Sequence, residues 1–206
     1  MKPKTTGATG IKSIKIGVSA CLLGIRVRYD GGHKRDRYIA ETLGQFFEYV
    51  PVCPEVEYGL PVPREALRLV GDPASPRLIT SRTGVDHTEA MQRWSDARTK
   101  DLAGEGLAGF IFKSRSPSSG LKGVTVYNDQ GKPGRSGSGI FAAAFIRQNP
   151  LLPVIDEGRL RNPALREHFI DGVFICARWL DFLKAGGTFC DLVSLHADLL
   201  LCILSH

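Results

Sequence analysis

Three places where an apolar run gives way to a loop are the main constraint on how this chain folds. Residues 110–112 are apolar, and a loop containing four serines, two cations and a proline follows directly at residues 113–120. Cys21 and Cys53 each follow a similar apolar run. Because ligands bind where the strands of an open α/β sheet end, we predict that the three strand ends converge on one site.

The rest of the pattern predicts strands that alternate with helices. We predict strands over residues 14–19, 49–52, 66–70, 77–80, 109–113 and 123–127. We predict helices from apolar residues at helical spacing over residues 37–47, 88–102 and 140–147. The first helix is expected to bury Ile39, Leu43, Phe46 and Phe47. This alternation predicts an α/β fold, a three-layer sandwich with a mostly parallel sheet.

Proline and glycine mark two stretches that we expect to lack regular structure. Residues 53–64 contain Pro54, Pro61 and Pro63, which disfavour both helix and strand. Residues 134–139 alternate glycine with polar residues just before a predicted helix. We interpret them either as a flexible connector or as a cradle in which backbone N–H groups bind a phosphate.

After Pro153 the chain changes to a helical pattern. Asn162 and Pro163 predict the start of a helix that ends at residues 186–187, and a second helix is predicted over about residues 190–206. The residues expected to face inward are Leu165, Phe169, Val173, Phe174, Trp179 and Leu183. We therefore expect a flexible leader (1–13), an α/β domain (14–150) and a partial helical segment (151–206).

Charge and cysteine content limit the partners and the compartment. Lys plus Arg number 27 against 21 Asp plus Glu, and this net charge of +6 favours an anionic partner such as a nucleotide or RNA. No apolar run approaches the roughly 18 residues of a membrane span, and residues 1–15 lack the apolar stretch of a signal peptide. We expect a cytoplasmic protein without a membrane partner, whose five cysteines are thiols or metal ligands.

Cys21, Cys53 and Glu55 are the first candidates for chemistry. A free cysteine is usually a small buried apolar residue, but both cysteines lie in loops rich in glycine or proline. Glu55 follows Cys53 closely, so its carboxylate is interpreted either as a metal ligand or proton donor or as a turn cap or partner of Arg64. The hydroxyl-rich loop at 113–120 is either a solvated turn or a set of donors aimed at a reacting group.

Five short blocks together resemble the thiouracil desulfidase family. They are Ser-Ala-Cys-Leu-Leu-Gly at 19–24, Arg-Tyr-Asp-Gly at 28–31, Cys-Pro-Glu-Val at 53–56, Gly-Leu-Pro-Val-Pro-Arg at 59–64 and Lys-Ser-Arg-Ser-Pro-Ser-Ser-Gly at 113–120. The resemblance covers roughly residues 14–150. The segment after residue 150 is similar to the start of a helical domain found in tRNA 4-thiouridine desulfidases.

The resemblance implies a 4Fe–4S cluster held by three cysteines, with one iron open to the substrate's sulfur. Two of these positions match Cys21 and Cys53, and Ser119 stands at the third. The catalytic positions match Glu55 and Ser116. In the implied non-redox reaction the iron acts as a Lewis acid, Glu55 handles protons for the attacking water and Ser116 positions the base.

The remaining implied contacts concern the phosphate groups of a nucleotide substrate. Arg28 and Lys113, together with the glycine-rich loop, are expected to meet these phosphates. The expected substrate is a thiolated uracil, with 4-thiouridine in tRNA preferred because of the helical tail. Free thiouracil is the nearest alternative substrate.

Ser119 leaves the function open between two classes. Serine oxygen is harder and less acidic than a thiol, and it matches iron in a sulfide cluster poorly. The serine is therefore an engineered change in an otherwise active enzyme, a weak ligand, or the mark of a copy that lost its cluster and its activity. The last interpretation predicts an alternative function, a cluster-free nucleotide- or RNA-binding domain without catalysis.

Overall fold

Four parallel strands form the central sheet of the computed structural model, which describes residues 13–128, 130–189 and 191–193. The strands are β1 (Ile14–Ser19), β2 (Phe47–Val52), β5 (Phe110–Phe112) and β8 (Val154–Asp156). They lie in the order β2-β1-β5-β8, and each neighbouring pair is parallel. The carboxyl ends of all four strands therefore meet at one edge.

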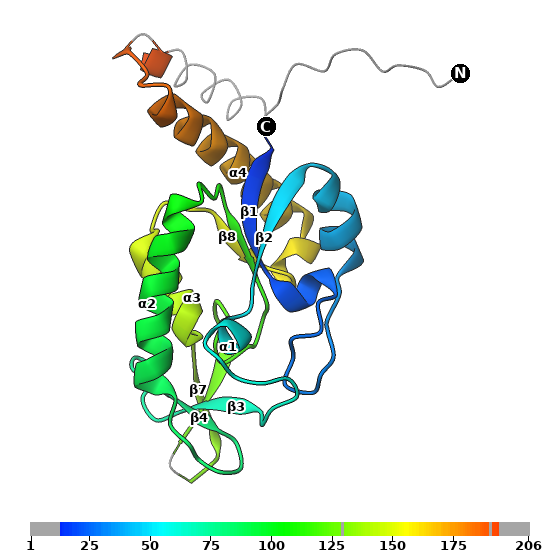
Figure 1. Ribbon diagram of the computed structural model, residues 1–206, viewed down its shortest axis with the longest axis vertical. Helices are drawn as coiled ribbons and strands as arrows, with labels where there is room; N and C mark the ends of the chain where they lie inside the picture. The colour runs from blue at the N-terminus through cyan, green and yellow to red at the C-terminus, as the bar shows by residue number, and fades with distance from the viewer. Residues whose placement is uncertain (1–12, 129, 190, 194–206) are drawn as a thin grey trace, which may run out of the picture.

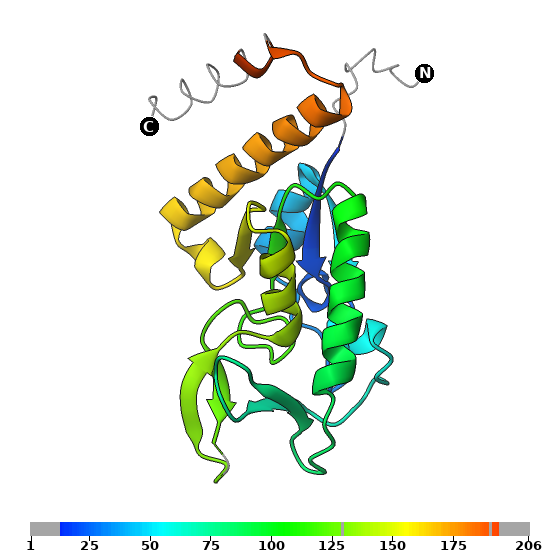
Figure 2. The same ribbon diagram turned by 90° about the vertical axis from the view of Figure 1, so that its left-hand side faces the viewer.

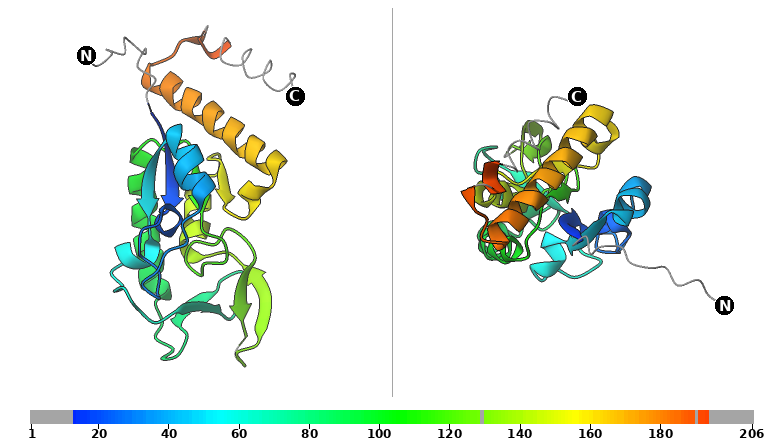
Figure 3. Two further views of the ribbon diagram at one scale, coloured as in Figure 1. Left: turned by 90° about the vertical axis from the view of Figure 1, so that its right-hand side faces the viewer. Right: turned by 90° about the horizontal axis from the view of Figure 1, so that it is seen from above.

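Helices cover both faces of this sheet and confirm the predicted three-layer α/β fold (Figure 1). The helices α2 (Thr88–Gly104) and α3 (Ile140–Gln148) pack on one face. The other face is covered by α4 (Pro163–Lys184) and by two short helical turns, η2 (Tyr38–Thr42) and η3 (Leu43–Gln45). Figures 2 and 3 show α4 crossing the sheet near the end where β1 begins.

Aromatic packing fixes β5 against α3. Phe110 and Phe112 are fully buried, and their rings contact those of Phe141 and Phe145 with centroids 4.9–6.0 Å apart. Gly17 on the neighbouring strand leaves the space that the Phe110 ring fills, because a Cβ there would lie 2.2 Å from Phe110 Cδ2. Buried aromatic rings of this size dominate the stability of a core.

A second, mixed sheet lies beyond the carboxyl ends of the first (Figure 1). Its strands are β3 (Leu67–Val70), β4 (Arg77–Thr80), β6 (Val124–Tyr127) and β7 (Pro133–Gly137), in the order β4-β3-β6-β7. The prediction for residues 134–139 was wrong, because most of this stretch is β7, which pairs antiparallel with β6. Backbone pairing with β6 uses the amides that a phosphate cradle would need.

Three further predictions of local structure need correction. Residues 37–45 are helical as predicted, but they form the π-helical η2 and the 3-10 turn η3 rather than a regular α-helix, and the segment ends before residue 47 because β2 begins at Phe47. Phe46 is consequently exposed. Residues 53–64 do contain a helical turn, α1 (Pro54–Glu57), because proline is compatible with the first position of a helix. The strand β8 was not predicted, since a run of three residues carries little periodicity.

The helix α4 packs on the sheet through both of its halves, because Cys176, Ala177 and Leu180 in its C-terminal half contact the same core cluster as its N-terminal half. Asn162 caps the helix as predicted, since its side chain accepts a hydrogen bond from Leu165 N–H at 3.2 Å. Phe169 and Val173 are buried as predicted. Among the inward-facing residues that we predicted, these are exposed instead: Phe174, Trp179 and Leu183. The face that contacts the core continues through Cys176, Ala177 and Leu180, so the three exposed residues lie at other positions around the helix.

The predicted domain limits fall partly outside the described residues. The leader at 1–12 and the residues 194–206 of the second C-terminal helix are not described. The strand β8 joins the central sheet after the expected boundary at residue 150, so the sheet uses chain from both sides of that boundary. Within the described part of the chain, no helix is both long and apolar enough to cross a membrane.

Candidate functional site

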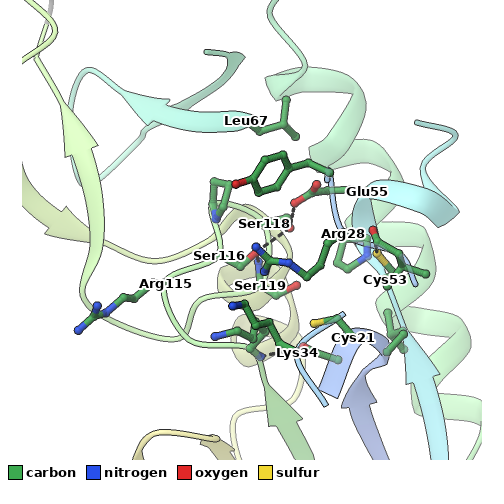
Figure 4. A pocket seen from close by; sticks show the side chains of 18 of the residues that line it. Cys21, Arg28, Lys34, Cys53, Glu55, Leu67, Arg115, Ser116, Ser118 and Ser119 are labelled. Atoms are coloured by element: carbon green, nitrogen blue, oxygen red, sulfur yellow. Dashed lines mark hydrogen bonds between the residues drawn. The ribbon is translucent and has the colours of Figure 1, made fainter. Parts of the chain in front are cut away.

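The carboxyl edge of the central sheet opens into a cavity of about 370 Å³ (Figure 4). Cys21 lies in η1 (Ala20–Leu23) directly after β1, and Cys53 lies between β2 and α1. Residues 113–119, which we call the serine loop, follow β5. The cavity is lined by every residue that the sequence predicted for the site: Cys21, Arg28, Cys53, Glu55, Lys113, Ser116 and Ser119.

Glu55 is fixed by Arg64 and connects to the serine loop. Arg64 donates from Nε and Nη2 to Glu55 Oε2 at 2.9 and 2.6 Å. Both side chains are largely buried, and Arg64 also donates to Val27 O at 2.9 Å. The other carboxylate oxygen, Oε1, accepts from Ser118 Oγ at 2.9 Å. The predicted alternative in which Glu55 pairs with Arg64 is therefore confirmed, and it leaves one oxygen facing the loop.

Hydroxyl groups extend this arrangement through the loop. Ser118 Oγ lies 3.1 Å from Ser116 Oγ, and Ser116 Oγ accepts from Ser119 N–H at 3.1 Å. A continuous series of hydrogen bonds thus joins the carboxylate of Glu55 to Ser119. A carboxylate within hydrogen-bond reach of hydroxyl groups can take up and return a proton at this site.

Burial raises the thiol pKa of both cysteines that line the cavity. Cys21 is buried, which raises its thiol pKa to about 11, and the neighbouring Cys53 adds to the shift. Burial likewise raises the pKa of Cys53, whose Sγ lies 3.8 Å from Val27 O. The same burial favours the neutral form of each thiol over the thiolate.

The loop is anchored to α3 at its far end. Ser118 O accepts from Phe141 N–H at 2.9 Å, and Pro117 O accepts from Ile140 N–H at 3.3 Å. Gly139, which caps α3, lies so close that a Cβ there would be 2.5 Å from Ser118 O. The N-terminal N–H groups of α3 are thus occupied by the serine loop, and they do not form the phosphate cradle that the glycine-rich stretch suggested.

Two cations predicted to meet phosphate have carboxylate partners. Arg28 Nε lies 3.4 Å from Asp30 Oδ1, and Lys113 forms an ion pair with Glu157. Glu157 and Tyr29 contribute to this region although neither was predicted for it, whereas Ser118 belongs to the hydroxyl-rich loop that was predicted to supply donors. Tyr29 lies inside a quoted sequence block, so adjacency was a usable signal for it. Glu157 follows the unpredicted strand β8 and had no such signal.

These features define a class of protein: an α/β fold with two thiols, a carboxylate and serine hydroxyls gathered at the carboxyl ends of parallel strands. The sequence model of the 2-thiouracil desulfurase family matches residues 16–157, from β1 to the residue after β8. The chain belongs to this family.

Two known proteins are similar to this chain. The Bacillus subtilis (strain 168) protein YbbK is 33% identical over 137 residues, which are 64% of this chain and 88% of that protein. The 4Fe–4S-dependent thiouracil desulfidase TudS has a similar structure, with a TM-score of 0.60 and 32% sequence identity. The structural match covers 76% of this chain and 99% of that protein.

The donors in the cavity do not fit a cluster held by three thiolates. Iron–sulfur clusters are normally bound by cysteine thiolates, and Cys21 and Cys53 are the only thiols that line this cavity among the described residues. The third described cysteine, Cys176, lies on α4. No group of three or more His, Cys, Asp or Glu in the described ranges can hold a metal ion. Ser119 offers a buried hydroxyl where a third thiol would complete the set.

Proposed function

We propose that this protein removes sulfur from a thiolated uracil without net redox change, and that its substrate is 4-thiouridine in tRNA. The observation that carries the proposal is the hydrogen-bonded series from Glu55 through Ser118 to Ser116 beside the two thiols. Membership of the 2-thiouracil desulfurase family supports the same reaction.

The overall reaction replaces a thiocarbonyl with a carbonyl. Water adds to the ring carbon, the C–S bond breaks, and sulfur leaves as hydrogen sulfide while the water oxygen remains on the ring. Glu55 accepts the water proton on Oε1, the oxygen that faces the serine loop, and returns a proton to the departing sulfur. Ser116 and Ser118 orient the uracil base of the substrate through their hydroxyl groups. Arg64 holds the Glu55 carboxylate in place through its two hydrogen bonds.

The charge around the cavity supports a nucleotide rather than a free base. Of the described residues, five cations line the cavity against one carboxylate: Arg28, Lys34, Arg64, Lys113 and Arg115 against Glu55. Arg28, Arg64 and Lys113 have carboxylate partners. Lys34 and Arg115 have none in the described part of the chain. The two uncompensated positive charges favour the phosphates of a polynucleotide.

The helical segment is part of the tRNA proposal. The helix α4 starts six residues after the region that matches the family. We propose that it begins the helical domain found in tRNA 4-thiouridine desulfidases. The proposal also places the protein in the cytoplasm, where a reducing environment keeps Cys21 and Cys53 as thiols.

A second function, cluster-free binding of a nucleotide or RNA, is favoured by the donor set of the cavity. Two thiols and the Ser119 hydroxyl do not match the thiolate ligands of a cluster. This function predicts a colourless protein whose RNA affinity falls as salt screens the phosphate contacts. Undetectable or salt-independent RNA binding contradicts it.

The decisive experiment is anaerobic reconstitution with iron and sulfide, followed by assay of sulfide release from 4-thiouridine-containing tRNA and from free 4-thiouracil. Desulfidation requires release from at least one substrate, and the tRNA proposal requires faster release from tRNA. Glu55→Gln is expected to abolish release, whereas Glu105→Gln, which alters a carboxylate outside the cavity, retains it. Full activity of Glu55→Gln excludes the proton-transfer role.

A further inference from the structure

Lys113 and Glu157 face each other at the carboxyl ends of two neighbouring strands. Phe112 on β5 is in register with Asp156 on β8, so the two charged residues occupy the next position on each strand. Their side chains form a largely buried ion pair. Glu157 N–H also donates to Phe112 O at 3.3 Å. The ion pair therefore links the carboxyl ends of β5 and β8 at the point where the serine loop begins.

The ammonium group of Lys113 is fully used within the protein. An ammonium has three N–H donors and no acceptor. In this structure Lys113 Nζ contacts Glu157 Oε1, Ser114 O at 3.1 Å and Ser114 Oγ at 3.2 Å. These three contacts leave no donor directed at a ligand in the cavity.

Glu157 also holds Ser114, the second residue of the serine loop, through hydrogen bonds. Ser114 N–H donates to Glu157 Oε2 and Ser114 Oγ donates to Oε1, both at 2.7 Å. On the other side, Lys113 N–H donates to Ser19 Oγ at 2.8 Å, which ties the same segment to the end of β1. The beginning of the serine loop is thus anchored to two strands that are remote in sequence.

The backbone of the serine loop contains one residue in an unfavourable conformation. Arg115 has a φ of 57°, in the left-handed region that non-glycine residues disfavour. Such a conformation persists where the surrounding structure determines it from several sides. Here Glu157 fixes the segment before Arg115, and α3 fixes the segment after it through Ser118 O. This turn directs Ser116 and Ser118 towards Glu55.

We propose that Lys113 and Glu157 are positioning residues, which hold the serine loop so that its hydroxyl groups reach Glu55 and the substrate base. This inference rests on the proposed function for its consequence in catalysis. It differs from the phosphate contact that the resemblance implied for Lys113. The ion pair supports the serine loop, which is proposed to contact the uracil base and not the phosphate. Loss of the pair should therefore lower the affinity for neutral and phosphorylated ligands equally.

The test compares the affinity of a neutral and an anionic ligand. We would titrate 4-thiouracil and 4-thiouridine 5′-monophosphate into the full chain and its Lys113→Met, Glu157→Gln and double variants by calorimetry, with Glu105→Gln as control. Each single change is expected to weaken both ligands by about tenfold, the loss for one charge-assisted hydrogen bond. The double variant is expected to lose less than the product, because it leaves no unpaired buried charge.

A phosphate-binding Lys113 gives a different pattern. Its replacement would weaken the nucleotide and leave 4-thiouracil unchanged, and that result overturns the proposal. Independent losses in the double variant also overturn it, because they show no coupling between the two side chains.

Hydrogen exchange separates failure of this inference from failure of the proposed function. The amides of Ser114 and Ser119, which donate to Glu157 and Ser116, are expected to exchange about tenfold faster in both single variants, whereas the strands β1 and β5 and the Glu105→Gln control keep their protection. If the unmodified chain binds neither ligand, the proposed function fails and exchange decides the inference. Unchanged exchange of the loop overturns the positioning role.

Discussion

Arg64 donates two hydrogen bonds to one oxygen of Glu55 and leaves the other oxygen to Ser118. This division lets one carboxylate serve two purposes. Oε2 anchors the side chain to a segment that enters the second sheet, and Oε1 faces the cavity. The arrangement also buries a charge pair near the serine loop, which gives a measurable contribution to stability.

We expect Arg64→Met to lower the free energy of unfolding by about 3–5 kcal/mol, because it leaves the carboxylate of Glu55 buried without its partner. The double variant Arg64→Met/Glu55→Gln is expected to recover part of that loss. Urea unfolding of the two single variants and the double variant measures both effects. Strictly additive losses would show that the two side chains do not stabilise each other.

Ser119→Cys is expected to raise the iron content after anaerobic reconstitution, because it places a third thiol beside Cys21 and Cys53. Iron, sulfide and visible absorption are measured beside the unmodified chain. Ser75→Cys is the control, since it adds a cysteine at an exposed turn outside the cavity. Equal cluster loading of all three proteins would mean that Ser119 does not limit the site.

Gly139→Ala is expected to destabilise the protein by about 1–3 kcal/mol, the usual cost of overpacking. A Cβ there meets backbone atoms of Ser118 and Ser119 that have no flexible end to move. Gly104→Ala is the matched control, because its Cβ meets nothing within 4 Å and it lies in α2. Thermal unfolding compares the two, and equal stability of both variants argues against the close approach.

Glu157 gives the stability of the protein a pH dependence on the acid side. Burial acts to raise its pKa, but hydrogen bonds from Lys113 and Ser114 outweigh it and hold the pKa below the ordinary value of 4.5. The stabilisation from this carboxylate is therefore complete above that ordinary value and is lost as pH falls through the lower, folded-state pKa. We expect the unmodified chain to lose more stability than Glu157→Gln between pH about 6 and about 3. An equal loss of unfolding free energy in the two proteins across this range, measured by urea unfolding, would contradict the expectation.

The central architecture could be predicted because its signals are local. The apolar run of β5, the periodicity of α2 and α3 and the Asn162 cap of α4 identify these elements without knowledge of their neighbours. Convergence of the Cys21, Cys53 and serine-loop segments followed from a general rule about parallel sheets. The short sequence blocks identified the candidate residues, and in the structure these residues line one cavity.

What could not be predicted depends on contacts between distant segments. The strand β8 has three residues and exists because β5 offers it a partner. The glycine-rich stretch became β7 for the same reason, since β6 supplies its hydrogen bonds. The pairing of Lys113 with Glu157 follows from β8, so no reading of residues 113–120 alone would have found it.

The hydrogen bonds from the first turn of α3 to Ser118 O tie the serine loop directly to the helix. The helix is seated on the rings of Phe110 and Phe112 through Phe141 and Phe145. We therefore expect that a change in the shape of one of these four rings, which lie in the core below the cavity, shifts the hydroxyl groups of the serine loop. Variants of the aromatic core should be expected among those that alter turnover, even where the protein remains fully folded.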